Sequence, residues 1–188
     1  MNAMTLKDAK KELKQRPKPK EKIIREYTTG EGILIGKVAC QLPDKTYYKQ
    51  GMYQANILLS VEEGQHLTKE LEQMQQRQYE TVGEGTELTT ITTIIEPYTT
   101  ENKTLQGKYI LRTQNLSQTW ENVDVSKPFI KVTKELENKM LNGAAFPIKE
   151  GDVVSLTVRF ETYTTSHSTG LIAVLKGVEI INPLNIYT

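Results

Sequence analysis

The stretch DVVSLTVRFETYTT, residues 152–165, decides the fold more directly than any other part of the sequence. Apolar and polar residues alternate along it with a period of two, as in a strand with one buried face. The predicted buried face carries Val154, Leu156, Val158, Phe160 and Thr162. The predicted outer face carries Val153, Ser155, Thr157, Arg159, Glu161 and Tyr163. The pattern predicts one long strand.

The residues after this strand predict its partner. A polar turn covers residues 165–169, and an apolar run then extends from Gly170 to Asn182, where Pro183 ends it. Two strands joined by a short polar turn form an antiparallel hairpin. We therefore expect a hairpin at the C-terminal end of the sequence.

Working outward from the hairpin, further strands are predicted by runs of β-branched and aromatic residues. They cover Gly32–Leu42, Met52–Val61, Thr89–Thr100 and Gly107–Gln118. Helical spacing of Leu67, Leu71 and Met74 predicts a helix over Glu62–Glu80, and a shorter helix is predicted over Thr133–Leu141 with Thr133 as its N-cap. About six strands with one clear helix between them predict a mainly β protein. The expected architecture is a five- to six-stranded barrel of the oligonucleotide-binding (OB) type.

The charges are distributed unevenly along the chain. Residues 1–26 hold nine basic and four acidic residues, a net charge of +5, whereas the remaining 15 basic and 19 acidic residues give −4. Prolines at positions 17 and 19 interrupt any helix there. We expect residues 1–30 to form a flexible basic arm and residues 31–188 to form the OB domain. The arm is either a solvated tail or a nucleic-acid contact.

The location is predicted from the cysteine content and the absence of long apolar segments. Cys40, the single cysteine, lies in an apolar stretch, as expected for a buried thiol in a reducing compartment. No segment approaches the ~20 apolar residues of a membrane span, and the N-terminus lacks the apolar core of a signal peptide. We expect a cytoplasmic protein.

Residues with catalytic potential are scarce. His66 and His167 are the two histidines, and neither has the spacing of a metal site, while one cysteine cannot build a zinc site. The sequence also lacks a Gly-x-Ser-x-Gly nucleophile motif. We therefore expect no enzyme activity, no metal and no cofactor.

Basic and aromatic residues that stand close together give the clearest functional signal. Single-stranded nucleic acid requires cations for its phosphates and flat side chains on which bases stack. The predicted contacts are Lys45, Tyr47, Tyr48, Lys49, Lys108, Arg112, Trp120, Lys131, Arg159 and Tyr163. For Tyr47 and Tyr48 the alternative is packing over one end of the barrel. For Phe129, which alternates with Lys131, the pattern leaves burial or exposure open.

The C-terminal hairpin also resembles a known family. Gly151–Tyr163 followed by Gly170–Ile180 resembles the closing hairpin of phage-type, OB-fold single-stranded DNA-binding proteins of phages and mobile elements. Gly107–Arg112 resembles that family's middle strand, and Met52–Val61 its early strand. The resemblance implies sequence-independent binding of single-stranded DNA during replication or recombination, whereas the residues themselves leave RNA open as the ligand. It also implies a homodimer or higher oligomer that works with replication or recombination proteins.

The resemblance further implies that Lys108, Arg112, Arg159 and Tyr163 lie on or near the binding groove. One feature of the family is missing, because residues 183–188 contain no acid where the family has an acidic recruiting tail. The alternative function is a non-catalytic structural or adaptor β-barrel protein of a phage or mobile element.

Overall fold

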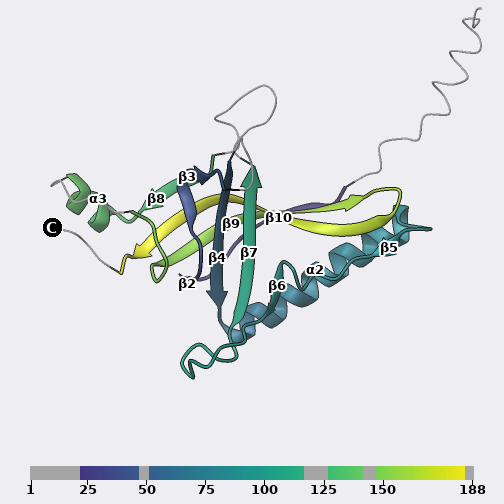
Figure 1. The fold of residues 1–188 in the computed structure, drawn as a ribbon, viewed down its shortest axis with the longest axis horizontal. Helices are drawn as coiled ribbons and strands as arrows, with labels where there is room; N and C mark the ends of the chain where they lie inside the picture. The colour runs from purple at the N-terminus through teal and green to yellow at the C-terminus, as the bar shows by residue number, and fades with distance from the viewer. Residues whose placement is uncertain (1–21, 47–50, 117–126, 142–146, 185–188) are drawn as a thin grey trace, which may run out of the picture.

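The computed structural model describes residues 22–46, 51–116, 127–141 and 147–184. Its strands are β1 (Ile24–Thr28), β2 (Gly32–Leu34), β3 (Ala39–Asp44), β4 (Met52–Leu59), β5 (Glu87–Leu88), β6 (Ile95–Pro97), β7 (Tyr109–Leu116), β8 (Phe129–Val132), β9 (Val153–Thr164) and β10 (Ser168–Asn182). Its helices are α2 (Val61–Val82) and α3 (Lys134–Leu141). The predicted mainly β architecture, with its main helix between strands, is confirmed (Figure 1).

Five strands close into a barrel. β2 pairs with β4, β4 with β7, β7 with β10, β10 with β9, and β9 returns to β2. All of these pairings are antiparallel except the one between β7 and β10, where Val174 lies opposite Gln114. β8 continues along the same edge of β10, also in parallel, with Phe129 opposite Gly177. The closed barrel is the arrangement expected of an OB fold.

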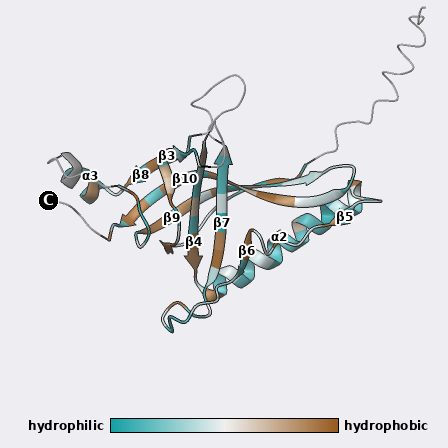
Figure 2. Cartoon of the chain, viewed as in Figure 1, coloured by the Kyte–Doolittle hydropathy of each residue, from teal (hydrophilic) through white to brown (hydrophobic). Residues whose placement is uncertain are grey.

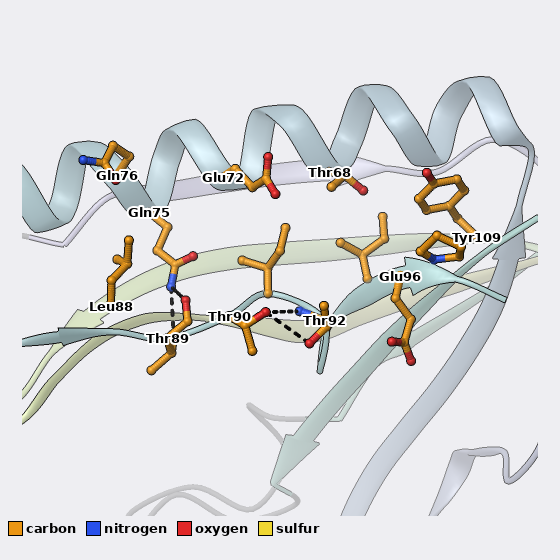
Figure 3. Close-up of a pocket in the computed structure, with 13 residues that line it drawn as sticks. Thr68, Glu72, Gln75, Gln76, Leu88, Thr89, Thr90, Thr92, Glu96 and Tyr109 are labelled. Atoms are coloured by element: carbon orange, nitrogen blue, oxygen red, sulfur yellow. Dashed lines mark hydrogen bonds between the residues drawn. The ribbon is translucent and has the colours of Figure 1, made fainter. Parts of the chain in front are cut away.

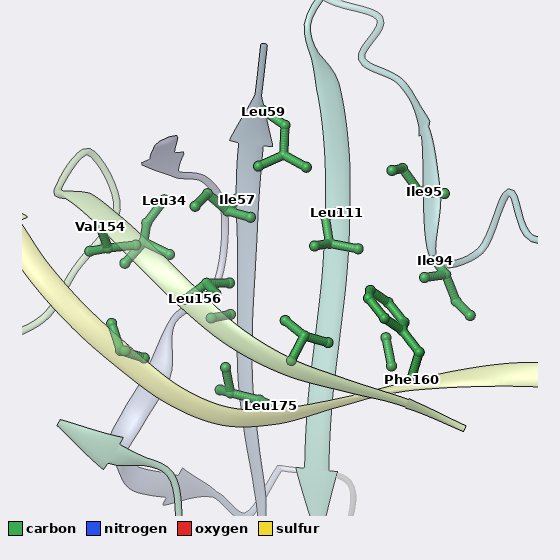
Figure 4. Close-up of a cluster of buried hydrophobic side chains, with 14 of the residues drawn as sticks. Leu34, Ile57, Leu59, Ile94, Ile95, Leu111, Val154, Leu156, Phe160 and Leu175 are labelled. Carbon is green, nitrogen blue, oxygen red and sulfur yellow. The ribbon is translucent and has the colours of Figure 1, made fainter. Parts of the chain in front are cut away.

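The barrel encloses the alternating apolar residues that the sequence predicted. Val154, Leu156, Val158 and Phe160 of β9 are fully buried, as are Ile57 of β4 and Leu175 of β10 (Figure 4). Colouring by hydropathy shows that the barrel strands are largely apolar, whereas α2 is largely hydrophilic (Figure 2). Burying large aliphatic side chains stabilises each by about 1.5–3 kcal/mol, so this core is the main stabilising element of the fold.

Helix α2 begins after Ser60, which caps it, at the point where the strand alternation of β4 gives way to helical spacing. The Ser60 hydroxyl accepts a hydrogen bond from the backbone N–H of Glu63 at 3.2 Å, which satisfies one free donor of the first turn. Leu67, Leu71 and Met74 then form the buried stripe that was predicted from their spacing. The helix ends at Val82, followed by Gly83, two residues beyond the predicted end at Glu80.

The second half of α2 packs against the distal end of the β9–β10 hairpin, beyond the barrel (Figure 1). We call this part the extension; it comprises residues 75–90 and 162–170. Polar side chains hold it together: Gln78 donates to the Thr164 hydroxyl at 3.1 Å, and the hydroxyls of Thr86 and Thr169 are 2.7 Å apart. Gln75 and Gln78 are buried, and this burial is tolerated because both side chains are hydrogen-bonded.

Three predicted boundaries were wrong. Ile24–Thr28, assigned to the arm, forms β1 and pairs with β9, so the sheet begins before residue 31. Much of Thr89–Thr100 is not a strand, because the chain turns at residues 92–94 and only Ile95–Pro97 pairs, with β7. Gly32–Leu42 is divided between β2 and β3. The basic residues before Lys22 lie outside the described residues.

The short helix was predicted correctly. α3 begins after Thr133, whose hydroxyl accepts a hydrogen bond from the N–H of Leu136 at 3.4 Å. Neither described helix combines the length and apolarity needed to cross a membrane.

Candidate nucleic-acid interface

The register of the hairpin assigns the predicted contact residues of β9 to its outer face. Opposite residues of antiparallel strands share a face, and the pairs Tyr163–Gly170 and Arg159–Val174 alternate with pairs in the core. The Val174–Gln114 pairing continues this outer face onto β7. Residues far apart in sequence are thereby brought onto one surface.

A groove of about 410 Å³ is hollowed into this surface. Arg112 of β7 and Tyr163 of β9, both predicted from the sequence, line it together. The other lining residues are Gln54, Asn56, Thr93, Ile94, Thr113, Gln114, Leu171, Ile172 and Ala173. The groove thus combines a cation, an aromatic ring, amides and apolar residues, which are the groups that single-stranded nucleic acid requires.

Arg112 is held in place by β6 and by the turn that precedes it. Its Nη2 donates to Glu96 Oε1 at 2.6 Å, and its Nη1 donates to the Thr92 carbonyl at 3.1 Å. The Arg112 and Glu96 side chains are each 37% exposed. Such exposed pairs contribute about 0–1 kcal/mol, so a phosphate group can replace the carboxylate at little cost in stability.

Tyr163 lies against the backbone of β10. A Cβ atom added to Gly170, its cross-strand partner, would lie 2.5 Å from Tyr163 Oη and 2.6 Å from its Cζ. The hydroxyl end of the ring, together with the Thr89 hydroxyl, therefore occupies the space that glycine leaves open. Tyr163 is half-buried, and it keeps one side toward the groove. A ring supported in this way is pre-positioned for stacking.

Arg159 occupies a different environment on the same face. Its Nε lies 2.8 Å from Glu161 Oε1, as an ion pair without hydrogen-bond geometry. The Glu161 side chain is only 11% exposed, and Lys22 Nζ approaches it at 3.7 Å. A carboxylate enclosed by two cations is not easily displaced. Arg159 thus neutralises a buried acid and is not among the residues that line the groove.

The remaining predicted contacts are dispersed. Lys131 of β8 is 3.6 Å from Glu179 and its side chain is 65% exposed. Lys45 is exposed after β3, and Lys108 is half-buried just before β7. Tyr47, Tyr48, Lys49 and Trp120 lie outside the described residues.

Several groove residues were missed by the sequence analysis. Gln54 and Asn56 stand on the polar side of the alternating strand β4, and that alternation was the available signal. Gln114 and Ile172 were not identifiable, because only the pairing of β7 with β10 brings them together. Phe129, whose exposure the pattern left open, is 51% exposed.

A second hollow of similar size lies between α2 and residues 88–97 (Figure 3). Glu72 and Glu96 line it together with several threonines, and Gln75 spans it to the carbonyl of Thr89 at 2.7 Å. Two carboxylates repel phosphate, and no lysine or arginine is among the lining residues. The outer groove is therefore the better nucleic-acid site.

Metal binding and nucleophilic catalysis have little support in the described part of the chain. Residues 22–46, 51–116, 127–141 and 147–184 contain no group of three or more metal-ligating side chains. Burial raises the pKa of the Cys40 thiol to about 12, so this thiol stays protonated at neutral pH. A protonated, buried thiol is a poor nucleophile.

Comparison with known proteins supports the fold. No protein-family model and no curated protein sequence matches the chain. The structure is similar to gp2.5, a single-stranded DNA-binding protein encoded by bacteriophage T7, with a TM-score of 0.62 and 11% identity over 88% of this chain and 91% of that one. It is also similar to the single-stranded DNA-binding protein of bacteriophage Enc34 in complex with single-stranded DNA, with a TM-score of 0.58 and 10% identity over 87% and 89% of the two chains. The predicted likeness to phage OB-fold single-stranded DNA-binding proteins is thus confirmed in the fold.

Proposed function

We propose that this protein binds single-stranded DNA without sequence preference, in the outer groove of its barrel. The observation that carries the proposal is the meeting of Arg112 and Tyr163 in one groove of a barrel whose fold matches those of single-stranded DNA-binding proteins. Neither residue forms a catalytic arrangement with its neighbours. The proposed activity is therefore binding without catalysis.

Each group in the groove has a defined part in this proposal. Arg112 contacts a phosphate in exchange for Glu96, and Tyr163 stacks on a base. Gln54, Asn56 and Gln114 offer amide donors and acceptors that suit any base edge or phosphate. One stacked base contributes about 1–3 kcal/mol, and this contribution does not depend on sequence because every base has a π face.

The setting of this activity is also part of the proposal. Binding of this kind serves DNA replication or recombination, where single strands are exposed in the cytoplasm of a phage host. The buried thiol of Cys40 fits a reducing compartment. Assembly into an oligomer and contacts with replication proteins belong to the same proposal, as does a role for the basic residues before Lys22.

The test is a fluorescence anisotropy titration with a labelled oligo-dT, at low and moderate salt, beside the matching duplex. We expect the single strand alone to bind tightly, with an affinity that falls as salt rises. Tyr163→Leu removes the π face but keeps a large apolar side chain at this position, so it is expected to weaken binding about tenfold. Tyr163→Phe keeps the ring and is the matched control.

Each contrary outcome has its own meaning. Equal binding to single strand and duplex would assign the affinity to the basic N-terminal residues. No binding to either form, together with a defined oligomer in light scattering, would replace the proposal with the structural or adaptor function.

A further inference from the structure

We propose that Phe129 of β8 is a second base-stacking platform, which extends the interface along β10 beyond the groove. This inference rests on the proposed function, because it lengthens the path of the same single strand. The residue lies outside the groove, and none of the groove residues contributes to it.

The Phe129 ring lies flat against the backbone of β10. Phe129 pairs in register with Gly177, and a Cβ atom added at Gly177 would overlap the ring carbons Cζ, Cε1 and Cε2. The residue is nevertheless 51% exposed. One ring face is therefore covered by the strand and the other faces solvent. An exposed, rigidly supported ring face is what a base needs in order to stack.

The same construction occurs at the groove. Each aromatic residue is the register partner of a glycine of β10, and the hydroxyl end of Tyr163 lies over Gly170 where the ring of Phe129 lies over Gly177. The register shift between Leu175 and Gly177 places Gly177 opposite Thr157, on the same outer face as Gly170. The interval between the glycines therefore equals six residues of β9, roughly 20 Å at ~3.3 Å per residue. Two supported rings on the outer face of one strand define a track for an extended chain.

Cations accompany the second platform. Lys127 is exposed two residues before Phe129, and Lys131 follows two residues after it, with a side chain that is 65% exposed. Lys131 is 3.6 Å from Glu179, a loose contact that a phosphate can replace. An aromatic ring between two cations matches the alternation of base and phosphate in a single strand.

Ile130, the residue next to Phe129, allows a test of whether the ligand at this edge is a base or a protein strand. Ile130 is 36% exposed and points to the opposite side of β8, because successive residues of a strand alternate. A base stacks on Phe129 alone, whereas a protein strand added to the edge of β8 would contact both residues. Ile130→Ala is therefore the matched control for Phe129→Ala.

The experiment measures the affinity of the full chain for labelled oligo-dT of about 4 and about 16 nucleotides, the two ends of the range of OB site sizes. The short oligonucleotide fits the groove alone, and the long one reaches both platforms. We expect Phe129→Ala to weaken binding of the long oligonucleotide about tenfold and to leave the short one unchanged. Ile130→Ala is expected to change neither, and circular dichroism and melting temperature confirm that each variant is folded.

The outcomes distinguish this inference from the proposed function. If the wild type binds both oligonucleotides and Phe129→Ala changes neither affinity, the inference about Phe129 is wrong and the proposal of binding in the groove is unaffected. If Ile130→Ala weakens binding of the long oligonucleotide as much as Phe129→Ala does, the edge of β8 matters rather than the ring, and the inference is again wrong. If the wild type binds neither oligonucleotide, both the inference and the proposed function are wrong.

Discussion

The barrel and the extension are held together by different forces. The barrel surrounds fully buried aliphatic and aromatic side chains such as Leu156 and Phe160, whereas the extension joins α2 to the hairpin tip through buried glutamines and threonines. Apolar burial is large and non-directional, while each hydrogen bond contributes only ~0.5–1.5 kcal/mol net. From this comparison we expect the barrel to fix the fold and the extension to unfold locally at a lower free-energy cost.

The largest expected effect is in the barrel core. Leu156→Ala leaves a cavity at a fully buried position and is expected to lower the free energy of unfolding by about 2–5 kcal/mol, as measured by urea denaturation. Leu42→Ala, at an exposed position on β3, is the control and is expected to cost less than ~0.5 kcal/mol. Equal losses in the two variants would contradict the assignment of the core to the barrel.

The extension is expected to respond locally. Thr169→Val keeps the side-chain shape but removes the hydroxyl that meets Thr86 and Thr164, which should cost about 1–3 kcal/mol. Hydrogen exchange should then accelerate at the hairpin tip and the end of α2, while the barrel amides stay protected. Thr99→Val, at an exposed loop position, is the control. Acceleration throughout the barrel would show that the two regions unfold as one unit.

A third prediction concerns the contact between β6, which follows the extension, and the barrel. Glu96→Gln leaves Arg112 without a charged competitor, so single-stranded DNA is expected to bind up to about fivefold more tightly, with a steeper salt dependence. Glu72→Gln makes the same charge change at an exposed helix position and should have little effect. Weaker binding by Glu96→Gln would mean that Glu96 positions Arg112 rather than competing for it.

The smallest effect is expected at the end of β3, at Asp44. Hydrogen bonding to Lys37, and secondarily to the side chain and backbone of Thr46, lowers the pKa of Asp44 from 3.8 to about 2. A lowered folded-state pKa stabilises the fold above the unfolded value, and this contribution is lost as the pH falls from about 4 toward 2. An NMR titration should place the Asp44 midpoint near pH 2, and Lys37→Ala should move it upward. An unchanged midpoint in that variant would exclude Lys37 as the cause.

Features that depend on local pattern could be predicted from the sequence. The alternation over residues 152–165 predicted the buried face of β9 correctly, because the period of a strand is fixed by its backbone. Ser155 and Glu161 of the predicted outer face are buried as well. The spacing of Leu67, Leu71 and Met74 likewise identified α2, since helical periodicity does not depend on what the helix packs against. The OB-type barrel followed from the number and order of these elements.

The tertiary structure decided which of these residues act together. Arg112 and Tyr163 meet because β7 joins β10 in parallel, a pairing between distant segments that no local pattern encodes. Arg112 and Arg159 look equivalent in the sequence, yet one pairs with an exposed carboxylate and the other with a buried one. β1 was assigned to the arm for a related reason, since its strand character depends on hydrogen bonds to β9. The sequence by itself thus determined the C-terminal hairpin, the strands β4 and β7, both helices and the buried faces of β9 and α2. The groove, the partner of each cation and the supports beneath the two rings depend on non-local pairing.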